Sequence, residues 1–230
     1  MLRPKHYFLL LISLIFLLSG CQRRTDMSGE VDAEHISYQV IYLERMAGDI
    51  PTKMLPDEME AYYSKKFIKT SIEGYFGQFS LVQVANLKQN TVVSMLNFFG
   101  NKVYYVGKKG EIPAGIVALN NPTIKKTDDT IEICGFNSRR AIINNGDETY
   151  DIYYTEDIQI EDPNITTPYS SIDFVLADFR VQLSKLKMQL RMKTHESVTI
   201  PASTYSIPDD YKEVSKETME AIINSLFTKE

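Results

Sequence analysis

Apolar and polar residues alternate over several short segments of this chain, which is the pattern of half-buried β-strands. The clearest segment is residues 130–158, which we interpret as two strands joined by a tight turn at residues 144–147, Asn-Asn-Gly-Asp. Gly and Asn tolerate the positive φ that hairpin turns need. On the second strand Tyr150, Ile152 and Tyr154 share one face, so we expect this face to point into the core.

Further strands are predicted along the chain, separated by residues that favour turns. On the first, residues 36–44, the side chains of Tyr38, Val40 and Tyr42 share a face that we expect to point inward. The others are expected within residues 61–73 and at 79–87, 92–98 and 102–107. These short strands predict a mainly β (α+β) domain.

The predicted hairpin of residues 79–87 and 92–98 is apolar on both faces, whereas an antiparallel sheet with one wet face should alternate cleanly. Both faces therefore need cover, which a ligand, a dimer interface or a packed loop would each provide. For the second strand we choose Val92, Leu96 and Phe98 as the inward set, because two of the three are large.

Residues 172–192 allow two interpretations. Their large apolar residues are spaced by three and four positions, which is helical spacing. The same segment also alternates apolar and polar residues on either side of Ser184-Lys185, which fits two strands and a turn. The residues concerned are Leu176, Phe179, Val181, Leu183, Leu186, Met188, Leu190 and Met192. Periodicity alone favours the helix.

A C-terminal helix is predicted after Ser215, whose side chain can cap it. Met219, Ile222, Ile223 and Leu226 form a stripe on one side of this helix. A helix this short needs a surface to pack on. We therefore expect it to cover part of the sheet and to face the inward residues of the strands.

The first twenty residues are typical of an export signal. Arg3 and Lys5 precede an apolar segment at residues 7–18, which is too short to span a bilayer as a stable helix. Leu-Ser-Gly then precedes Cys21, which matches the site where bacteria cleave a lipoprotein precursor and attach diacylglycerol to the thiol. We predict a signal peptide at 1–20, a lipidated tether at 21–34 and one domain at 35–230.

Charge and residue types argue against several functions. Removal of the two basic residues before Cys21 leaves 23 Lys and Arg against 30 Asp and Glu, a net charge of −7, which disfavours nucleic acid as a partner. His35 and His195 are the only histidines after residue 20, and Cys134, beside a Gly in a predicted strand, fits a small buried hydrophobe. We expect no enzyme, no cofactor and no metal site.

Two motifs resemble a known group of proteins. One is the order of Gly135-Phe136, Arg139-Arg140-Ala141 and Tyr153-Tyr154-Thr155 around the predicted hairpin, and the other is the ending Tyr205-Ser-Ile-Pro-Asp-Asp-Tyr211. Together with the strand order they cover about residues 36–225. This pattern resembles exported lipoproteins of Gram-negative bacteria, of unknown function, with a fold similar to the LolA/LppX-type half-barrel. The group often carries a Cys where this chain has Ser138.

The resemblance implies a curved antiparallel sheet with the C-terminal helix as partial cover, and it favours two strands for residues 172–192. We expect an envelope lipoprotein, held by its N-terminal lipid in the outer membrane and facing the periplasm. It would bind or carry an apolar or lipid-like molecule in the concave sheet. The alternative is a structural or protein-interaction module without a small ligand. The expected lining residues are Tyr38, Val40, Tyr42, Val92, Leu96, Phe98, Tyr150, Ile152, Tyr154, Met219, Ile222, Ile223 and Leu226.

Overall fold

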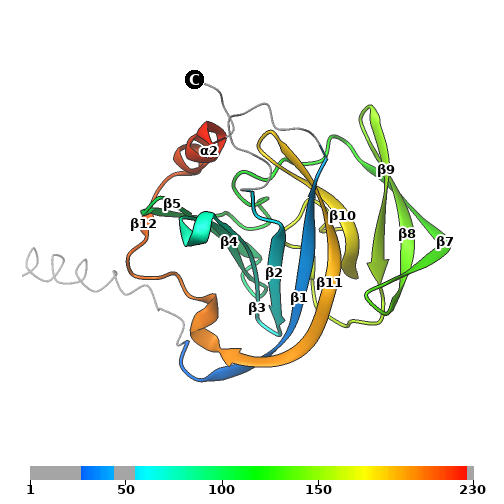
Figure 1. The fold of residues 1–230 in the computed structure, drawn as a ribbon, viewed down its shortest axis with the longest axis horizontal. Helices are drawn as coiled ribbons and strands as arrows, with labels where there is room; N and C mark the ends of the chain where they lie inside the picture. Colours follow the sequence, from blue (N-terminus) through cyan, green and yellow to red (C-terminus); the bar gives the residue numbers. More distant parts are fainter. Residues whose placement is uncertain (1–26, 44–54, 227–230) are drawn as a thin grey trace, which may run out of the picture.

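The computed structural model describes residues 27–43 and 55–226 (Figure 1). The predicted signal peptide, Cys21 and the first part of the tether lie outside these residues. The strands are β1 (Glu30–Tyr42), β2 (Glu58–Ser64), β3 (Phe67–Gly74), β4 (Phe79–Asn86), β5 (Thr91–Phe98), β6 (Asn101–Val106), β7 (Thr123–Ile133), β8 (Phe136–Asn145), β9 (Glu148–Thr155), β10 (Val175–Leu183), β11 (Leu186–Pro201) and β12 (Lys212–Glu213). Short 3-10 turns η2 (Tyr75–Gly77) and η3 (Ala202–Tyr205) and helix α2 (Lys216–Ser225) complete the described part.

All twelve of these strands form one curved, unclosed sheet in the order β12-β6-β5-β4-β3-β2-β1-β11-β10-β9-β8-β7. Neighbouring strands are antiparallel except for the short β12, which runs parallel to β6. The first strand lies in the middle of the sheet, between β2 and β11. The predicted curved antiparallel sheet with a C-terminal helix is confirmed, and the likeness to LolA stays a prediction.

Three boundaries differ from the sequence predictions. Strand β1 begins at Glu30, because β11 extends to Pro201 and provides a partner for every residue from there on, so residues 30–34 belong to the sheet and not to the tether. The segment 61–73 falls in a hairpin, β2–β3. Cys134 is not in a strand: with Gly135 it forms the turn between β7 and β8, at φ values of 53° and 79°.

Residues 172–192 are strands, as predicted from the resemblance. Strands β10 and β11 pair across a turn at Ser184-Lys185, and Ser184 has a φ of 53°. The helical spacing misleads because much of β10 is buried on both faces: residues Val175 to Phe179 are all buried. When consecutive strand residues are apolar, the positions three and four apart are apolar as well.

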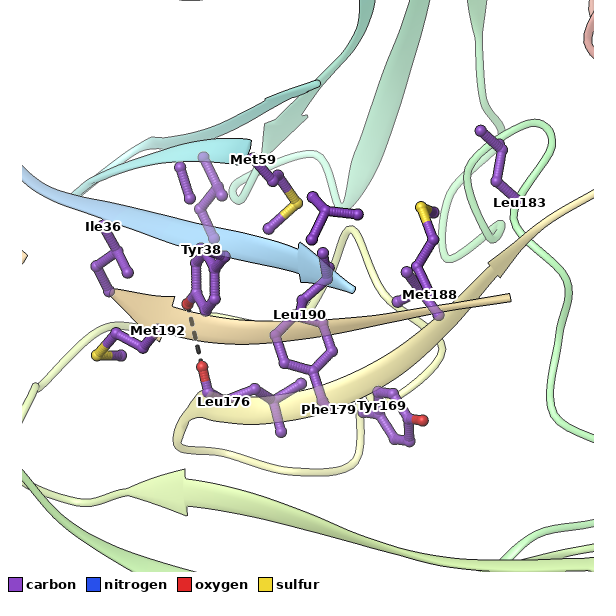
Figure 2. Packing of buried hydrophobic residues seen from close by; sticks show 14 of the residues in the cluster. Ile36, Tyr38, Met59, Tyr169, Leu176, Phe179, Leu183, Met188, Leu190 and Met192 are labelled. Carbon is purple, nitrogen blue, oxygen red and sulfur yellow. Dashed lines mark hydrogen bonds between the residues drawn. The ribbon is translucent and has the colours of Figure 1, made fainter. Parts of the chain in front are cut away.

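The core fills the concave face of the sheet (Figure 2). Two connections of the chain itself supply much of it: the strap, which we define as residues 107–122 between β6 and β7, and the plug, which we define as residues 156–174 between β9 and β10. Tyr169 and Ile172 of the plug are essentially inaccessible. Tyr38 of β1 donates a hydrogen bond from its hydroxyl to the carbonyl of Leu176, 3.1 Å away. The concave face is thus largely occupied by the protein's own side chains.

The convex face of the middle hairpin is covered as well. Val82 and Val84 of β4 and Met95 of β5 form a second buried cluster with Tyr205 of the C-terminal segment. Ile207 and Tyr211, from the same ending that resembles the lipoprotein group, pack against it. A packed segment therefore accounts for the second apolar face of this hairpin.

Helix α2 closes part of the concave side and is joined to the strap. Ser215 caps it by accepting a hydrogen bond from the Thr218 backbone N–H at 3.2 Å, and Met219 and Ile223 are buried. The strap passes under the helix at Gly115, whose φ is +82°. A Cβ there would lie 2.7 Å from Cδ1 of Ile223 and 3.0 Å from Cδ1 of Leu183, so only Gly fits.

We expect Gly115→Ala to destabilise the protein more than Gly135→Ala. Both residues have φ near +80°, but a Cβ at Gly135 would meet nothing within 4 Å. The control therefore measures left-handed strain alone, about 1–2 kcal/mol, and Gly115→Ala adds an overpacking cost of about 1–3 kcal/mol. Urea unfolding of the two variants tests this, and equal losses would contradict the close packing of strap and helix.

Candidate functional site

Two small apolar cavities lie inside the concave face, each with a volume of about 40 Å³. Ile72, Leu81, Leu183 and Met188 border both, so the two chambers adjoin each other. One water needs about 10–15 Å³ on this measure. Each chamber is therefore the size of a few waters, far below the hundreds of Å³ typical of ligand pockets.

All thirteen residues expected to point inward lie in the core cluster of the concave face or pack against it. Only some of them border a cavity. Tyr38 lines the first chamber, and Tyr42, Phe98 and Leu226 line the second. Tyr150 lines a separate cavity of about 60 Å³. The remaining eight are packed among other side chains, namely Val40, Val92, Leu96, Ile152, Tyr154, Met219, Ile222 and Ile223.

The first chamber has a polar wall. The hydroxyl of Thr70 donates to Oε1 of Gln83 at 3.4 Å, and the hydroxyls of Tyr38 and Tyr63 lie 3.4 Å apart. Asn164 of the plug also borders this chamber. Burial raises the pKa of Tyr63 to about 12 and also raises the pKa of Tyr38. Both phenols stay neutral at physiological pH, so this wall can form hydrogen bonds but does not supply a base.

A cavity larger than these three lies outside the core, and we call it the mouth cleft. This mouth cleft, of about 430 Å³, is bordered by the strap, by the plug and by the turn between β4 and β5. Its lining is about equally polar and apolar and consists of Asn90, Gly110, Glu111, Ile112, Ala118, Leu119, Pro122, Asp162, Ile165, Thr167, Pro168 and Ser170. No short-range pattern in the sequence indicates this cleft, because its lining residues come from segments without periodicity.

Glu111 is the charged residue that holds one side of the mouth cleft in place. Its carboxylate accepts hydrogen bonds from Nζ of Lys216 at 2.8 Å, from the Lys108 backbone N–H at 2.7 Å and from the Tyr105 hydroxyl at 2.9 Å. These donors, Lys216 first, lower the pKa of Glu111 to about 2. The strap is thereby tied to α2 and β6 by an ionised group.

The two histidines lie at the seam between β1 and β11, on opposite faces of the sheet. His35 is held between two carboxylates, with Nε2 2.5 Å from Glu60 and Nδ1 2.9 Å from Glu196, and Tyr62 stacks on its ring at 4.4 Å. His195 instead contacts Glu34, at 2.8 Å. Among residues 27–43 and 55–226 no group of three or more His, Cys, Asp and Glu is placed to hold a metal ion.

Ser197 and His195 do not form a hydrolytic triad. Both side chains bind the same carboxylate: the Ser197 hydroxyl donates to Glu34 at 2.9 Å, and the imidazole also contacts Glu34. A nucleophilic serine needs the imidazole, not the carboxylate, as its own partner. This cluster ties β1 to β11 and supplies no activated nucleophile.

Cys134 is partly exposed at its turn, and its thiol donates to the carbonyl of Lys193 at 3.3 Å. Burial raises its pKa, which reduces the fraction of thiolate. The expected small buried hydrophobe is therefore a half-buried turn residue.

No family model and no curated protein matches this chain. Solved structures do match, and among them are two of PNGF-II in different crystal forms, each with a TM-score of 0.52 and with identities of 14% and 15%. Each match covers 84% of this chain but only 32% or 33% of the other, so this chain spans about a third of the length of PNGF-II. At this identity the likeness shows the fold alone. In the described residues no helix is long and apolar enough to cross a membrane.

The His35 cluster predicts a pH-dependent contribution to stability. Burial alone would lower the pKa of His35, but the hydrogen bonds and charges of Glu196 and Glu60 outweigh it and raise the pKa above 6.5. The imidazolium therefore stabilises the fold fully below pH 6.5, and this contribution disappears as pH rises through the folded pKa. We expect the difference in free energy of unfolding between the native chain and His35→Gln to shrink from pH 5.5 to pH 8, and a difference independent of pH would refute this.

Proposed function

We propose that this protein is a non-catalytic, lipid-anchored interaction module of the bacterial envelope, in which the half-barrel serves as a rigid scaffold. The observation that carries this proposal is the filled concave face. The plug, the strap and α2 occupy it and leave two apolar chambers of about 40 Å³ each. A lipid-like ligand needs a continuous pocket roughly ten times larger.

The mouth cleft is the surface best suited to contact a partner. Its volume of about 430 Å³ is in the range of small-ligand sites, and its lining is about equally polar and apolar. Glu111 is neutralised by Lys216, whereas Asp162 adds negative charge. We therefore propose a neutral or cationic ligand rich in hydroxyl or amide groups, such as a segment of peptide or glycan.

Binding of an apolar molecule, the function first expected, is the second candidate. It is favoured by the two adjoining chambers, since Tyr42, Phe98 and Leu226 give the second one an almost wholly apolar lining. A lipid-like ligand would have to displace Leu226 of the C-terminal segment or residues of the plug.

The anchor rests on the motif that ends at Cys21. We propose that residues 1–20 are removed, that Cys21 carries the lipid and that the domain faces the periplasm from the outer membrane. Mass spectrometry of membrane-extracted protein should show an acylated N-terminal Cys21. A Cys21→Ala protein that stays in the membrane fraction would contradict the anchor.

Leu96→Trp tests whether this inward position is packed core, as the scaffold requires. Leu96 is 1% exposed and borders neither chamber, so a larger ring should overpack the core and lower the free energy of unfolding by about 1–3 kcal/mol. Ile131→Trp, at a residue that is 38% exposed on β7, is the control and should be nearly neutral. Urea unfolding measures both.

Native mass spectrometry and lipid extraction of the purified protein provide the second arm. A scaffold should carry no lipid and should not take up a fluorescent fatty acid. A lipid that copurifies repeatedly, or uptake of the fatty acid, would reject the scaffold in favour of the carrier.

A further inference from the structure

Five exposed lysines gather at one end of the strands β2 to β6. Lys65 and Lys66 form the turn between β2 and β3, Lys88 lies in the turn between β4 and β5, and Lys108 and Lys109 follow β6 closely. Successive antiparallel strands return to the same end of a sheet. The three segments are therefore neighbours in space, and we refer to their five lysines as the basic end.

Backbone hydrogen bonds hold these segments in a row. The Leu87 N–H donates to the carbonyl of Lys66 at 3.0 Å, and the Gly110 N–H donates to the carbonyl of Asn90 at 2.8 Å. The strands β2 to β6 are consecutive neighbours in the sheet. Because neighbouring strands lie about 4.8 Å apart, the row extends over roughly 20 Å.

The basic end lacks the counter-charges that other lysines have. Nζ of Lys102, Lys187, Lys193 and Lys216 each lies within 2.8 Å of a carboxylate oxygen. In the part of the chain that the structure describes, no lysine of the basic end forms such an ion pair. Lysines held side by side repel one another, so the fold itself gains nothing from this arrangement.

The charge is confined to one end of these strands. Residues 64–67, 87–91 and 107–110 contain the five lysines and no Asp or Glu. The turns at the other end of the same strands, residues 74–78 and 98–101, contain no charged residue at all. Although the chain after residue 20 is acidic overall, this end of the sheet presents a local positive surface, which is complementary to an anionic one.

The folded part of the chain begins at the same end. Ala33, near the start of β1, pairs with Ser64, the last residue of β2 and the one before the first lysine turn. Met27 packs against the same buried cluster as Phe67, the first residue after that turn. The N-terminal segment therefore approaches the domain beside the basic end.

The tether brings a bilayer within reach of these lysines. Six residue steps separate Cys21 from Met27, which is at most about 20 Å of extended chain. This distance is similar to the width of the basic end. The tether also contributes Arg23 and Arg24, which add positive charge on the side of the lipid.

We propose that the basic end docks on anionic phospholipid headgroups of the bilayer that holds the lipid at Cys21, with the strands β2 to β6 pointing away from the membrane. This proposal rests on the lipid anchor proposed above. An acyl anchor and a basic patch together hold a protein stably on a membrane. Each lysine close to an anionic surface favours the docked orientation by about fivefold.

Energy transfer from a single Trp tests the orientation, because the sequence contains no Trp. Full-length, lipidated Gln89→Trp carries the donor at the basic end, and Phe76→Trp carries it in the turn at the other end of β4. Both positions are exposed. Each protein is reconstituted in vesicles of phosphatidylcholine, with or without phosphatidylglycerol, that contain a lipid with a dansyl-labelled headgroup.

We expect transfer from position 89 to rise at least about twofold when phosphatidylglycerol is present, because the docked orientation then dominates. Transfer from position 76 should stay low in both kinds of vesicle, since β4 keeps the two ends about 27 Å apart. About 1 M NaCl shortens the screening length to about 3 Å. It should remove the rise without releasing the protein from the vesicles.

A charge variant in the Gln89→Trp background identifies the lysines responsible. Lys65→Gln, Lys66→Gln and Lys88→Gln together should abolish the rise while the protein still floats with the vesicles. Lys108 is left in place because it also acts on Glu217 of α2, whose pKa is lowered first by its own backbone N–H and by Ser215.

The matched control removes the same charge elsewhere and should keep the rise. It combines Lys125→Gln, Lys185→Gln and Lys212→Gln, at exposed residues in three other parts of the sheet. If both triple variants lose the rise equally, net charge and not the basic end is responsible, and the proposal fails.

The remaining outcomes separate docking from the anchor. Protein that floats with phosphatidylcholine vesicles but shows equal transfer from position 89 in both lipids keeps the anchor and rejects docking. Higher transfer from position 76 than from position 89 rejects the orientation. Protein that does not float with phosphatidylcholine rejects the anchor, and the proposal with it. Loss of the rise in inorganic phosphate but not in NaCl of equal ionic strength would assign the lysines to a discrete phosphate site instead of a lipid surface.

Discussion

The antiparallel ladder between β1 and β11 is the constraint on which the rest of the fold depends. It pairs every residue from Glu30 to Tyr42 with the strand that ends at Pro201, apart from one bulge at Ser37/Tyr38. Strands β2 to β6 lie on one side of it and β7 to β10 on the other. Without this ladder the chain would consist of two separate sheets, each with an exposed edge and an uncovered apolar face. Its partners are far apart in sequence, so the single core forms only after a costly long-range closure.

The concave face shows how a curved sheet can bury its apolar side without a ligand. The strap crosses from β6 at one end of the sheet to β7 at the other, and on the way its backbone pairs with Gln182 and Ser184. The plug contributes Tyr169, whose hydroxyl donates to the carbonyl of Arg180 at 2.7 Å. The first contacts satisfy backbone groups of the strap where it runs beside apolar side chains, and the Tyr169 hydroxyl ties the plug to β10. The concave face of the curved sheet is therefore lined by the protein's own loops, and the mouth cleft is the space that these loops leave between them.

The alternation of residues predicted most strands and the direction of their side chains. Tyr38, Leu96 and Tyr154 all face the core because period-two alternation is a local property that a buried sheet preserves. Boundaries set by distant partners were not predictable: Glu30 is in a strand only because Pro201 pairs with it. The turn at Cys134 was missed since Cys is not a residue that usually takes positive φ. The mouth cleft was not predictable for a related reason. Glu111 and Asp162 border the same cleft only because the tertiary structure brings their segments together.

The position of β1 also determines how the protein responds to force. The proposed lipid is attached just before this strand, so a pull on the membrane anchor acts along the strand axis. The ladder hydrogen bonds to β2 and β11 run perpendicular to that axis. They are therefore loaded together, in shear, and many must break at once before the strand can slide. An anchor joined to an edge strand such as β7 would let the same bonds open one after another, so the central insertion of β1 makes the N-terminal attachment mechanically strong.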